Sequence, residues 1–374
     1  SLVLVSSKES QLSHLEPVQI RSAWVENRKA RERDLATKLN ISEAELVEAH
    51  CGDFEDQAIM KARRIKVDLE VILHGAKRIG EVMVLTRNQS AVHEKIGKYE
   101  KIFANPGHAM TLGENIDLRI FQDKWKFGYA VEKTQEGNTR RSLQFFDAFG
   151  TAVHKIHMRE ASNLEAYEVL CSEIASDETG IRVQSEPMPV RNTSKNQDLA
   201  PELVQRWSEM TDVHQFMGIL KDMNLSRYDA VELIGRTYAY QVKPDQIPRL
   251  LQDVAKRAVP IMCFVGSRGC IQIHSGQIFQ TKAMGPWFNI MDPTFHLHLR
   301  TDHIDQLWVV KKPTKDGHVT SVEAYNADKQ LIIQFFGKRH EGEMELMTWR
   351  NCVDNLVHYE ASQKKEAVKD YVHV

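Results

Sequence analysis

The sequence has little cysteine, no long apolar run and almost no net charge, and each absence excludes a class of protein. The five cysteines are scattered over 374 residues without a CxxC pair, which excludes zinc ribbons and thioredoxin-like redox sites at motif level. We expect reduced, mostly buried thiols. No stretch approaches the ~18 apolar residues of a membrane span. The apolar run 2–5 is too short for a signal-peptide core. The expectation is a soluble, cytoplasmic protein without membrane insertion.

The near-balance of charge argues against nucleic acid as a partner. Lys and Arg number 49 against 51 Asp and Glu, a net charge of −2. A broad nucleic-acid surface usually needs a basic excess, which this chain lacks. Hydrophobic residues make up 42% of the chain, which is enough to bury a core. The 16 histidines make metal or haem chemistry worth testing.

Common catalytic signatures are missing as well. The chain contains no GxSxG or HExxH motif and no kinase-type set. The glycine-rich stretch 266–269 is not followed by the lysine and serine of a phosphate loop, so it predicts a hairpin turn.

The order of predicted elements occurs twice. Helices are expected from Val18 to Cys51, with a stop at Asn40 and a new start capped by Ser42. Short strands separated by turn signals follow from Gly80 to His157 and predict an antiparallel meander, and a helix covers 163–175. After a polar stretch come helices over 201–259, further strands, and a helix over 343–356.

An internal repeat strengthens this organisation. Sliding the chain by 179 residues lays 116–133 on 295–312, so that Tyr129 meets Trp308 and Lys133 meets Lys312. The same offset lays Ser142 on Ser321. We predict an α+β fold of two tandem, structurally similar halves, each a large antiparallel sheet with flanking helices. The predicted boundaries are 20–178 and 201–358 for the two repeats, 179–200 for a linker and 359–374 for a tail.

The strongest local feature is the segment 207–216, WSEMTDVHQF. Thr211 is a good N-cap residue, and Asp212 suits the positive end of a helix. A core stripe at helical spacing is expected on that helix. It comprises Val213, Phe216, Met217, Leu220 and Met223. His214 lies beside this stripe, and Gly218 one turn further on leaves room for a flat ligand. His214 is a candidate axial ligand of haem iron, although a partly exposed structural histidine is the more common explanation of this pattern taken alone.

Other residues supply candidates for ligand or metal contacts. A haem ligand would need cations for its two carboxylates, and the candidates are Arg227, Lys311-Lys312 and Lys338-Arg339. His296 and His298 alternate on one face of a predicted strand, as in some metal sites, and His274 or His303 would join them. Surface charges and structural histidines are the alternatives in each case.

Several ordered segments resemble one protein family. TDVHQF (211–216), FVGSRGCIQI (264–273), GPWFNIMDPTFHLHL (285–299), KKPTKDGHVTS (311–321) and GKRHEGE (337–343) are similar to the bacterial haem-utilisation proteins often called hemin-degrading factors, of the HemS/ChuS/PhuS type. In the first half SAVHEKIG (90–97) and IDLRIF (116–121) resemble the same family. The resemblance covers about residues 25–358.

The resemblance implies a haem cleft between sheet and helices and a set of contacts. It implies that His214 holds the iron and that Arg119 covers the distal side, and these two residues are the predicted catalytic pair. Propionate and pocket contacts are implied for Arg227, Lys312, Gln334 and Arg339, with Phe264 against the ring. Phe336 belongs to the same pocket but stands where relatives often have Tyr, so a hydroxyl is lost. His93 is a further candidate, through which the N-terminal half would bind a second haem.

The implied role is iron acquisition from imported haem. The resemblance predicts a protein that receives haem from an importer and traffics it, degrades it to release iron with an external electron donor, or does both. The alternatives are a pure haem chaperone that hands haem to a separate oxygenase, and a non-haem metalloenzyme using His296 and His298. A monomer or weak dimer is expected. No function is predicted for the tail after Glu360.

Overall fold

The computed structural model describes residues 15–55, 59–188 and 197–360. Most of the predicted tail and part of the predicted linker therefore lie outside the described residues. Among the residues that are described, the chain forms two compact units. Unit 1 takes the chain up to Arg87, then Glu94–Pro187 and Gly266–Gln272. Unit 2 takes Asn88–His93, Met188–Val265 and the chain from Ile273 onward.

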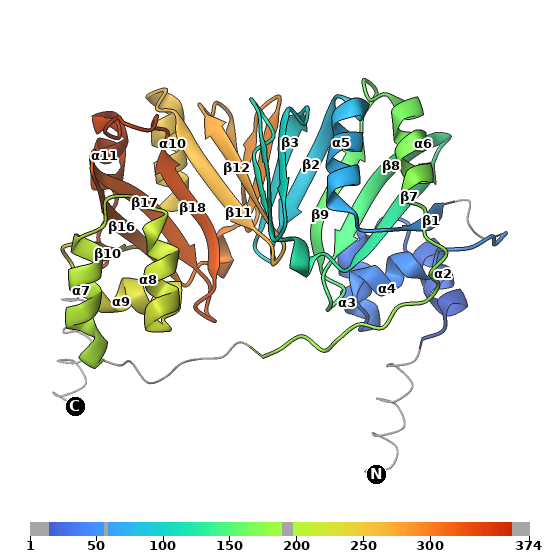
Figure 1. The fold of residues 1–374 in the computed structure, drawn as a ribbon, viewed down its shortest axis with the longest axis horizontal. Coiled ribbons are helices and arrows are strands. Elements are labelled where there is room, and N and C mark those ends of the chain that lie inside the picture. The colour runs from blue at the N-terminus through green and yellow to red at the C-terminus, as the bar shows by residue number, and fades with distance from the viewer. Residues whose placement is uncertain (1–14, 56–58, 189–196, 361–374) are drawn as a thin grey trace, which may run out of the picture. The chain divides into compact units, whose positions relative to one another are not determined.

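The α+β prediction is confirmed. The structure contains two antiparallel sheets of nine strands each, and the described residues form ten α-helices. Each half of the chain has three α-helices, a strand, a further α-helix, a run of strands and a last α-helix, in that order (Figure 1). The repeated order is the one that the sequence offset predicted.

The first part of the chain shows where the predicted meander was incomplete. Strand β7 pairs with β1 and β8, while β9 pairs with β8 and β2, so β2 joins the far side of a later hairpin. Strand β5 lies between β4 and β6, and these three strands form one end of the other nine-stranded sheet, where β6 pairs with β12 (Cys270–Gly276). Strand β1 and helix α5 were not predicted, although α5 carries an apolar stripe at helical spacing and is capped by Asp68. The elements are α2 (Pro17–Glu26), α3 (Glu32–Leu39), α4 (Glu43–Glu48), β1 (Met60–Ile65), α5 (Leu69–Ile79), β2 (Val82–Arg87), β3 (Ala91–Gly97), β4 (Lys101–Asn105), β5 (His108–Leu112), β6 (Leu118–Ile120), β7 (Phe127–Gln135), β8 (Asn138–Phe146), β9 (Ala152–Met158) and α6 (Leu164–Glu173).

The second part repeats this pairing. Strand β16 pairs with β10 and β17, and β18 pairs with β17 and β11, while β14 lies between β13 and β15. Strand β10 interrupts the stretch predicted as helical. The elements are α7 (Ala200–Ser208), α8 (Gln215–Met223), α9 (Arg227–Leu233), β10 (Ala239–Val242), α10 (Ile247–Lys256), β11 (Ile261–Gly266), β12 (Cys270–Gly276), β13 (Thr281–Met284), β14 (Trp287–Met291), β15 (Phe295–Arg300), β16 (Gln306–Thr314), β17 (Gly317–Tyr325), β18 (Leu331–Gly337) and α11 (Met347–Asp354).

The last helix begins at Met347, four residues later than predicted. The carboxylate of Glu345 accepts hydrogen bonds from the backbone and hydroxyl of Thr320 and from Arg350. Residues 341–346 before this helix contain a short turn and no helix.

A hydrophobic cluster in unit 2 positions the helices that matter for function. Helices α7, α8 and α9 pack on β16 and β17 through a buried group that includes Trp207, Phe216, Tyr228, Trp308 and Tyr325. The rings of Trp207 and Phe216 meet edge to face at 5.1 Å. Trp207 Nε1 also donates to the carbonyl of Lys311 at 2.9 Å. The start of α8 is therefore held, through Trp207, against strand β16.

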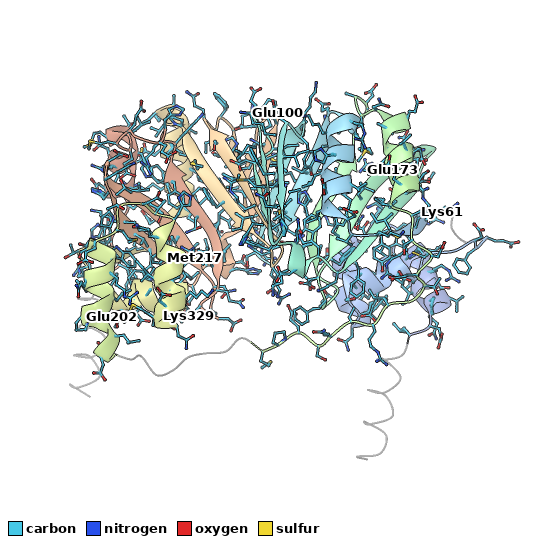
Figure 2. All side chains as sticks on the ribbon, in the orientation of Figure 1. Lys61, Glu100, Glu173, Glu202, Met217 and Lys329 are labelled. Carbon is cyan, nitrogen blue, oxygen red and sulfur yellow. The ribbon has the colours of Figure 1, made fainter. Side chains whose placement is uncertain are left out.

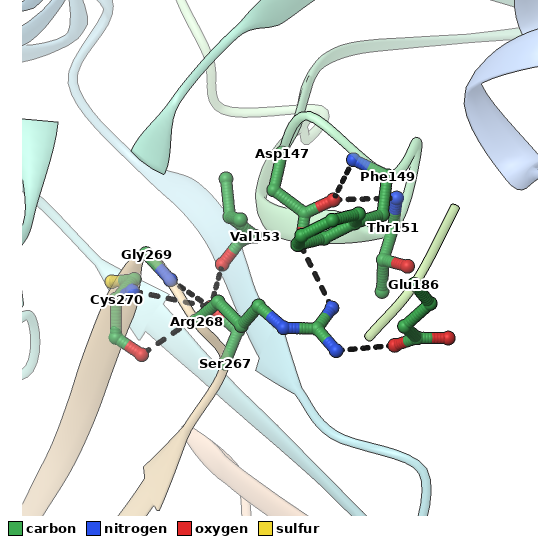
Figure 3. Close-up of polar contacts among 9 residues, drawn as sticks. All are labelled: Asp147, Phe149, Thr151, Val153, Glu186, Ser267, Arg268, Gly269 and Cys270. Carbon is green, nitrogen blue, oxygen red and sulfur yellow. Dashed lines mark hydrogen bonds and ion pairs between the residues drawn. The ribbon is translucent and has the colours of Figure 1, made fainter. Parts of the chain in front are cut away.

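In unit 1 an arginine of the 266–269 turn ties two loops together. Arg268 Nη1 lies 3.1 Å from Asp147 Oδ2, and Nη2 pairs with Glu186 (Figure 3). Asp147 Oδ1 accepts the backbone N–H groups of Phe149 and Thr151. The turn joins the neighbouring strands β11 and β12, which confirms the predicted hairpin turn, and Arg268 adds a structural contact to it.

No helix within the described ranges is long and apolar enough to cross a membrane.

Candidate functional site

The helical hairpin α8–α9 presents the candidate ligand. Helix α8 ends at Asn224, whose φ is 52°, and the hydroxyl of Ser226 caps α9 by accepting the backbone N–H of Asp229 at 3.0 Å. Arg227 is consequently the first residue of α9. Local sequence signals account for this turn, since Asn tolerates the left-handed conformation and Ser is a favoured N-cap residue.

The N-terminus of α8 differs from the prediction. The helix begins at Gln215, with His214 rather than Thr211 at the N-cap position. Gln215 Oε1 accepts the backbone N–H groups of Thr211 and Asp212, at 2.9 and 3.3 Å, which holds these residues in a turn before the helix. A second departure is Met217, which is 58% exposed instead of buried in the core stripe (Figure 2).

His214 is exposed but oriented. Its side chain is 89% exposed, and Nδ1 lies 2.7 Å from Asp212 Oδ1. The same oxygen accepts the backbone N–H of His214 at 2.8 Å. These two hydrogen bonds from His214 lower the pKa of Asp212, with a smaller contribution from Arg339. Gly218 borders open space where a side chain would begin.

Three of the predicted contact residues surround a buried carboxylate that sequence analysis did not identify. Glu323 on β17 accepts from Gln334 Nε2 at 3.0 Å, and lies 3.5 Å from Lys312 Nζ and 3.8 Å from Arg227 Nη1. Ser321 and Tyr325 donate their hydroxyls to it, each at 2.8 Å. Burial alone would raise the pKa of Glu323, but Lys312, Arg227 and the two hydroxyls lower it to about 2. A buried anion therefore organises these cations.

The two cations differ in how accessible they are. Lys312 is only 4% exposed, and its Nζ lies 4.5 Å from the centre of the Phe216 ring. Burial lowers the pKa of Lys312, although Glu323 opposes that shift. The Arg227 side chain is 24% exposed, and its Nη2 reaches Met217 Sδ at 3.5 Å on the outer side of α8. Of the two, Arg227 is the group that a ligand in solvent can approach.

The remaining predicted contact residues of unit 2 are the aromatic pair Phe264 and Phe336 and the cation Arg339. The rings of Phe264 and Phe336 are 5.1 Å apart on β11 and β18, and Phe264 is the register partner of Gln334. Arg339 Nη1 lies 3.9 Å from Asp316 Oδ2 in the β16–β17 hairpin. The preceding residue of that hairpin, Lys315, donates its backbone N–H to the carbonyl of Thr211 at 3.0 Å. The hairpin thus anchors the turn that carries His214.

Arg119 belongs to unit 1. It lies on β6 with Met110 of β5 and Ile271 of β12 as register partners. Its guanidinium pairs with Asp117 and donates to the carbonyl of Leu118 at 3.2 Å. Burial raises the pKa of Asp117, and Arg119 opposes that shift.

The other histidine candidates have different surroundings. His296 and His298 alternate with buried residues on β15, as predicted, and His298 Nδ1 lies 2.7 Å from Asn289 Oδ1. His93 is fully buried, with Nε2 3.2 Å from the carbonyl of Cys263, so its ring is enclosed by protein. Throughout the described part of the chain, no three His, Cys, Asp or Glu side chains gather in a way that would hold a metal ion.

A cavity of about 700 Å³ in unit 1 contains none of the predicted site residues. It is lined by Arg64, Ile65, Lys66, Val67, Lys126, Ser176, Asp177 and Glu178. Arg64 is already bonded there to the carbonyl of Gly180 and to Glu178, so the cavity has no evident connection with the histidine chemistry.

The sequence carries a signal for two residues of the site, Glu323 and Asp212, whose partners it did not reveal. The repeat offset aligns Glu323 with the neutral Gln144, and an acid gained at a buried repeat position is a sign of a paired charge. Asp212 was assigned to the helix dipole, whereas its carboxylate bonds the imidazole two residues later.

The exposed imidazole of His214, the open position at Gly218 and the accessible cation of Arg227 all belong to the hairpin α8–α9. Comparisons with known proteins identify the family of the chain. The model of the haemin-degrading HemS/ChuX domain matches the chain twice, over residues 40–174 and 224–356. The chain belongs to this family.

Relatives and solved structures match most of the chain. The hemin transport protein HemS of Yersinia enterocolitica is 37% identical over 326 residues, which cover 87% of this chain and 92% of HemS. The crystal structure of holo-PhuS, a heme-binding protein from Pseudomonas aeruginosa, matches with a TM-score of 0.86 and 34% identity, covering 92% of this chain and all of PhuS. ChuS, an E. coli heme oxygenase, matches with a TM-score of 0.80 and 33% identity over 90% of this chain and 99% of its own.

Proposed function

We propose that this protein binds haem in unit 2, with His214 as the axial ligand of the iron. The observation that carries the proposal is the exposed imidazole of His214, held by Asp212 and followed by the open position at Gly218. A neutral histidine is a common axial ligand of haem iron. The haem-binding relative PhuS supports the same ligand class.

The residues present fit the two ends of a haem molecule. A planar macrocycle needs a side of the helix without bulk, which Gly218 provides, and Met217 adds a polarizable thioether beside it. A propionate needs a cation that is reachable from solvent, which Arg227 provides. Lys312 and Gln334 contact Glu323, which also pairs with Arg227. The rings of Phe264 and Phe336 and the cation of Arg339 complete the proposed contact set.

The role of the bound haem follows from its own redox chemistry and from the relatives. Bound haem iron supplies oxygen chemistry when an external donor reduces it. We propose that the protein receives imported haem and either transfers it or opens the ring to release iron, as the names of a transport protein and a heme oxygenase among its relatives suggest. Arg119 is proposed, on the family resemblance, as the distal residue that would stabilise negative charge near the iron.

A haem titration tests the ligand. We expect His214→Ala to lose the Soret spectrum of a histidine-bound haem and to weaken affinity by at least tenfold. His74→Ala, which removes an exposed histidine on α5 of unit 1, is the matched control and should bind like wild type. Unchanged affinity and spectrum in His214→Ala would refute the proposal.

A single-turnover experiment separates carrier from enzyme. The haem complex is given a reductant and oxygen in the presence of catalase, because free peroxide destroys haem without catalysis. Loss of the Soret band with a defined tetrapyrrole product and carbon monoxide indicates a haem-degrading enzyme. Haem that stays intact and moves to an apo-acceptor indicates a carrier. In the enzyme case Arg119→Ala should slow the loss, and Lys124→Ala in the same unit should not.

A further inference from the structure

The turn before α8 fixes one carboxylate against His214. Asp212 Oδ1 accepts the backbone N–H of His214 at 2.8 Å and its Nδ1 at 2.7 Å. An ionised carboxylate is only an acceptor, so a hydrogen bond of this length requires the proton on Nδ1. In neutral imidazole the lone pair then belongs to Nε2.

The rest of the turn is braced on both sides of Asp212. Gln215 bonds back to the N–H groups of Thr211 and Asp212, and its Nε2 reaches the Thr211 hydroxyl at 3.3 Å. The carbonyl of Thr211 is bonded to the β16–β17 hairpin through Lys315. Phe216, two residues after His214, is buried against Trp207. The carboxylate is therefore held in place before any ligand arrives.

The opposite side of the ring is accessible. The His214 side chain is 89% exposed, and among the residues that the structure describes Nε2 has no hydrogen-bond partner. A ring whose Nδ1 is bonded to a carboxylate and whose Nε2 faces outward has the arrangement in which a protein orients a histidine toward a metal and raises its basicity.

We propose that Asp212 is a positioning residue that sets the tautomer of His214 and strengthens its Nε2 as a ligand. The inference rests on the proposed haem function and assigns a role within the same site. A more basic axial nitrogen favours ferric over ferrous iron, so Asp212 lowers the reduction potential of the bound haem. It thereby controls how readily an external donor reduces the complex.

The first test uses the protein without haem. Nitrogen-15 NMR of the imidazole at mildly alkaline pH should show His214 with its proton on Nδ1 and a bare Nε2. Asp212→Ala should shift the ring toward the Nε2-protonated form that free histidine prefers. A wild-type ring already protonated on Nε2 would overturn the inference, whatever haem does.

The second test uses the haem complex and separates charge from geometry. Asp212→Ala should weaken haem binding by about 10- to 100-fold. Asp212→Asn keeps an acceptor oxygen for both bonds, so it should bind within a few-fold of wild type but show a higher reduction potential. Glu209→Gln removes a nearby exposed acid that bonds Gln205 instead, and should change neither quantity. Circular dichroism and thermal unfolding establish that each variant is folded.

The outcomes distinguish this inference from the proposed function. If His214→Ala abolishes histidine-ligated binding while Asp212→Ala and Asp212→Asn keep wild-type affinity and potential, the positioning role is wrong and the haem function stands. If His214→Ala binds haem normally, the proposed ligand itself is wrong.

Discussion

In both units, lysines of the sheet are neutralised by acidic side chains, but the acids lie on the helices in unit 1 and on the sheet in unit 2. In unit 1 α3 ends at the left-handed Asn40 and Ser42 caps α4, as Asn224 and Ser226 do between α8 and α9, an offset of 184 residues. That offset places Ala30 opposite His214, Glu32 opposite Phe216, and Glu43 opposite Arg227.

Strand register supports the correspondence. Tyr129 pairs with Gln144 in unit 1, as Trp308 pairs with Glu323 in unit 2, and Gln144 pairs with Lys155 as Glu323 pairs with Gln334. The repeat offset of 179 residues is therefore maintained in three dimensions. Lys133 and Lys312 consequently stand at equivalent places on their sheets.

The difference lies in where the acid comes from. In unit 1 each lysine has its own helical carboxylate: Lys133 pairs with Glu32, and Lys155 lies 3.3 Å from Glu43. In unit 2 Lys312 and Arg227 share the single carboxylate of Glu323, which comes from the sheet. With the acid moved to the sheet, the helices of unit 2 are left to carry an imidazole and a guanidinium toward solvent. This is the physical basis for proposing the haem site in unit 2.

Removing the shared acid should have the largest effect. Glu323→Ala leaves Lys312 buried without its partner, and we expect a loss of about 3–5 kcal/mol in the free energy of unfolding. Glu32→Ala should cost only about 1 kcal/mol, since the Lys133 side chain is 30% exposed and can be solvated. Thermal or urea unfolding measures both. Equal losses would mean that the two pairs are energetically equivalent and that the comparison is wrong.

Acid should weaken both units through the same chemistry. The pKa of Glu32 and that of Glu323 are each lowered from 4.5 to about 2, against the effect of burial, by the neighbouring cations. A carboxylate with a depressed folded pKa stabilises the fold above its unfolded pKa, and this stabilisation is lost as pH falls from about 4.5 through about 2. Unfolding midpoints measured across this range should depend less steeply on pH in Glu32→Gln and in Glu323→Gln. An unaltered slope in either variant would contradict the assignment for that unit.

The charged residue that begins the second helix of each hairpin is Arg227 in unit 2 and Glu43 in unit 1. We expect only Arg227 to affect ligand binding. We expect Arg227→Gln to weaken haem binding about tenfold, or about 1.4 kcal/mol, because a reachable cation for a propionate is lost. Glu43→Gln at the equivalent place in unit 1 should leave haem affinity unchanged. Arg206→Gln on α7, an exposed arginine paired with Glu202, controls for the loss of surface charge. A titration in which Glu43→Gln and Arg227→Gln weaken binding equally would remove the distinction between the units.

The smallest effect is expected at Phe336. Its counterpart in unit 1 is His157, so the strand accepts a polar ring at this position. Phe336→Tyr should change stability by less than about 0.5 kcal/mol, since the residue is half-buried beside Phe264. If the added hydroxyl meets the ligand, haem affinity should rise by a few-fold. A large loss of affinity would show that the ring edge is closed off from solvent.

Much of the fold followed from short-range signals in the sequence. The stop at Asn40 and the restart at Ser42 are confirmed, with Ser42 and Glu45 bonding each other's backbone N–H groups. The repeat offset and the α+β class are also confirmed. These features depend on residues a few positions apart, or on a pattern repeated along the chain, which a sequence displays directly.

The tertiary structure decided which charges meet. Lys312 and Gln334 were predicted as ligand contacts, but the fold brings both to Glu323, and Lys312 is buried there. The cost of burying one charge depends on partners contributed by distant strands and helices, so spacing in the sequence does not reveal it. The sequence alone determined the doubled architecture and marked His214 as the candidate ligand. Only the packing of helix on sheet determined that unit 2 shares one acid between two cations and leaves Arg227 accessible to a ligand.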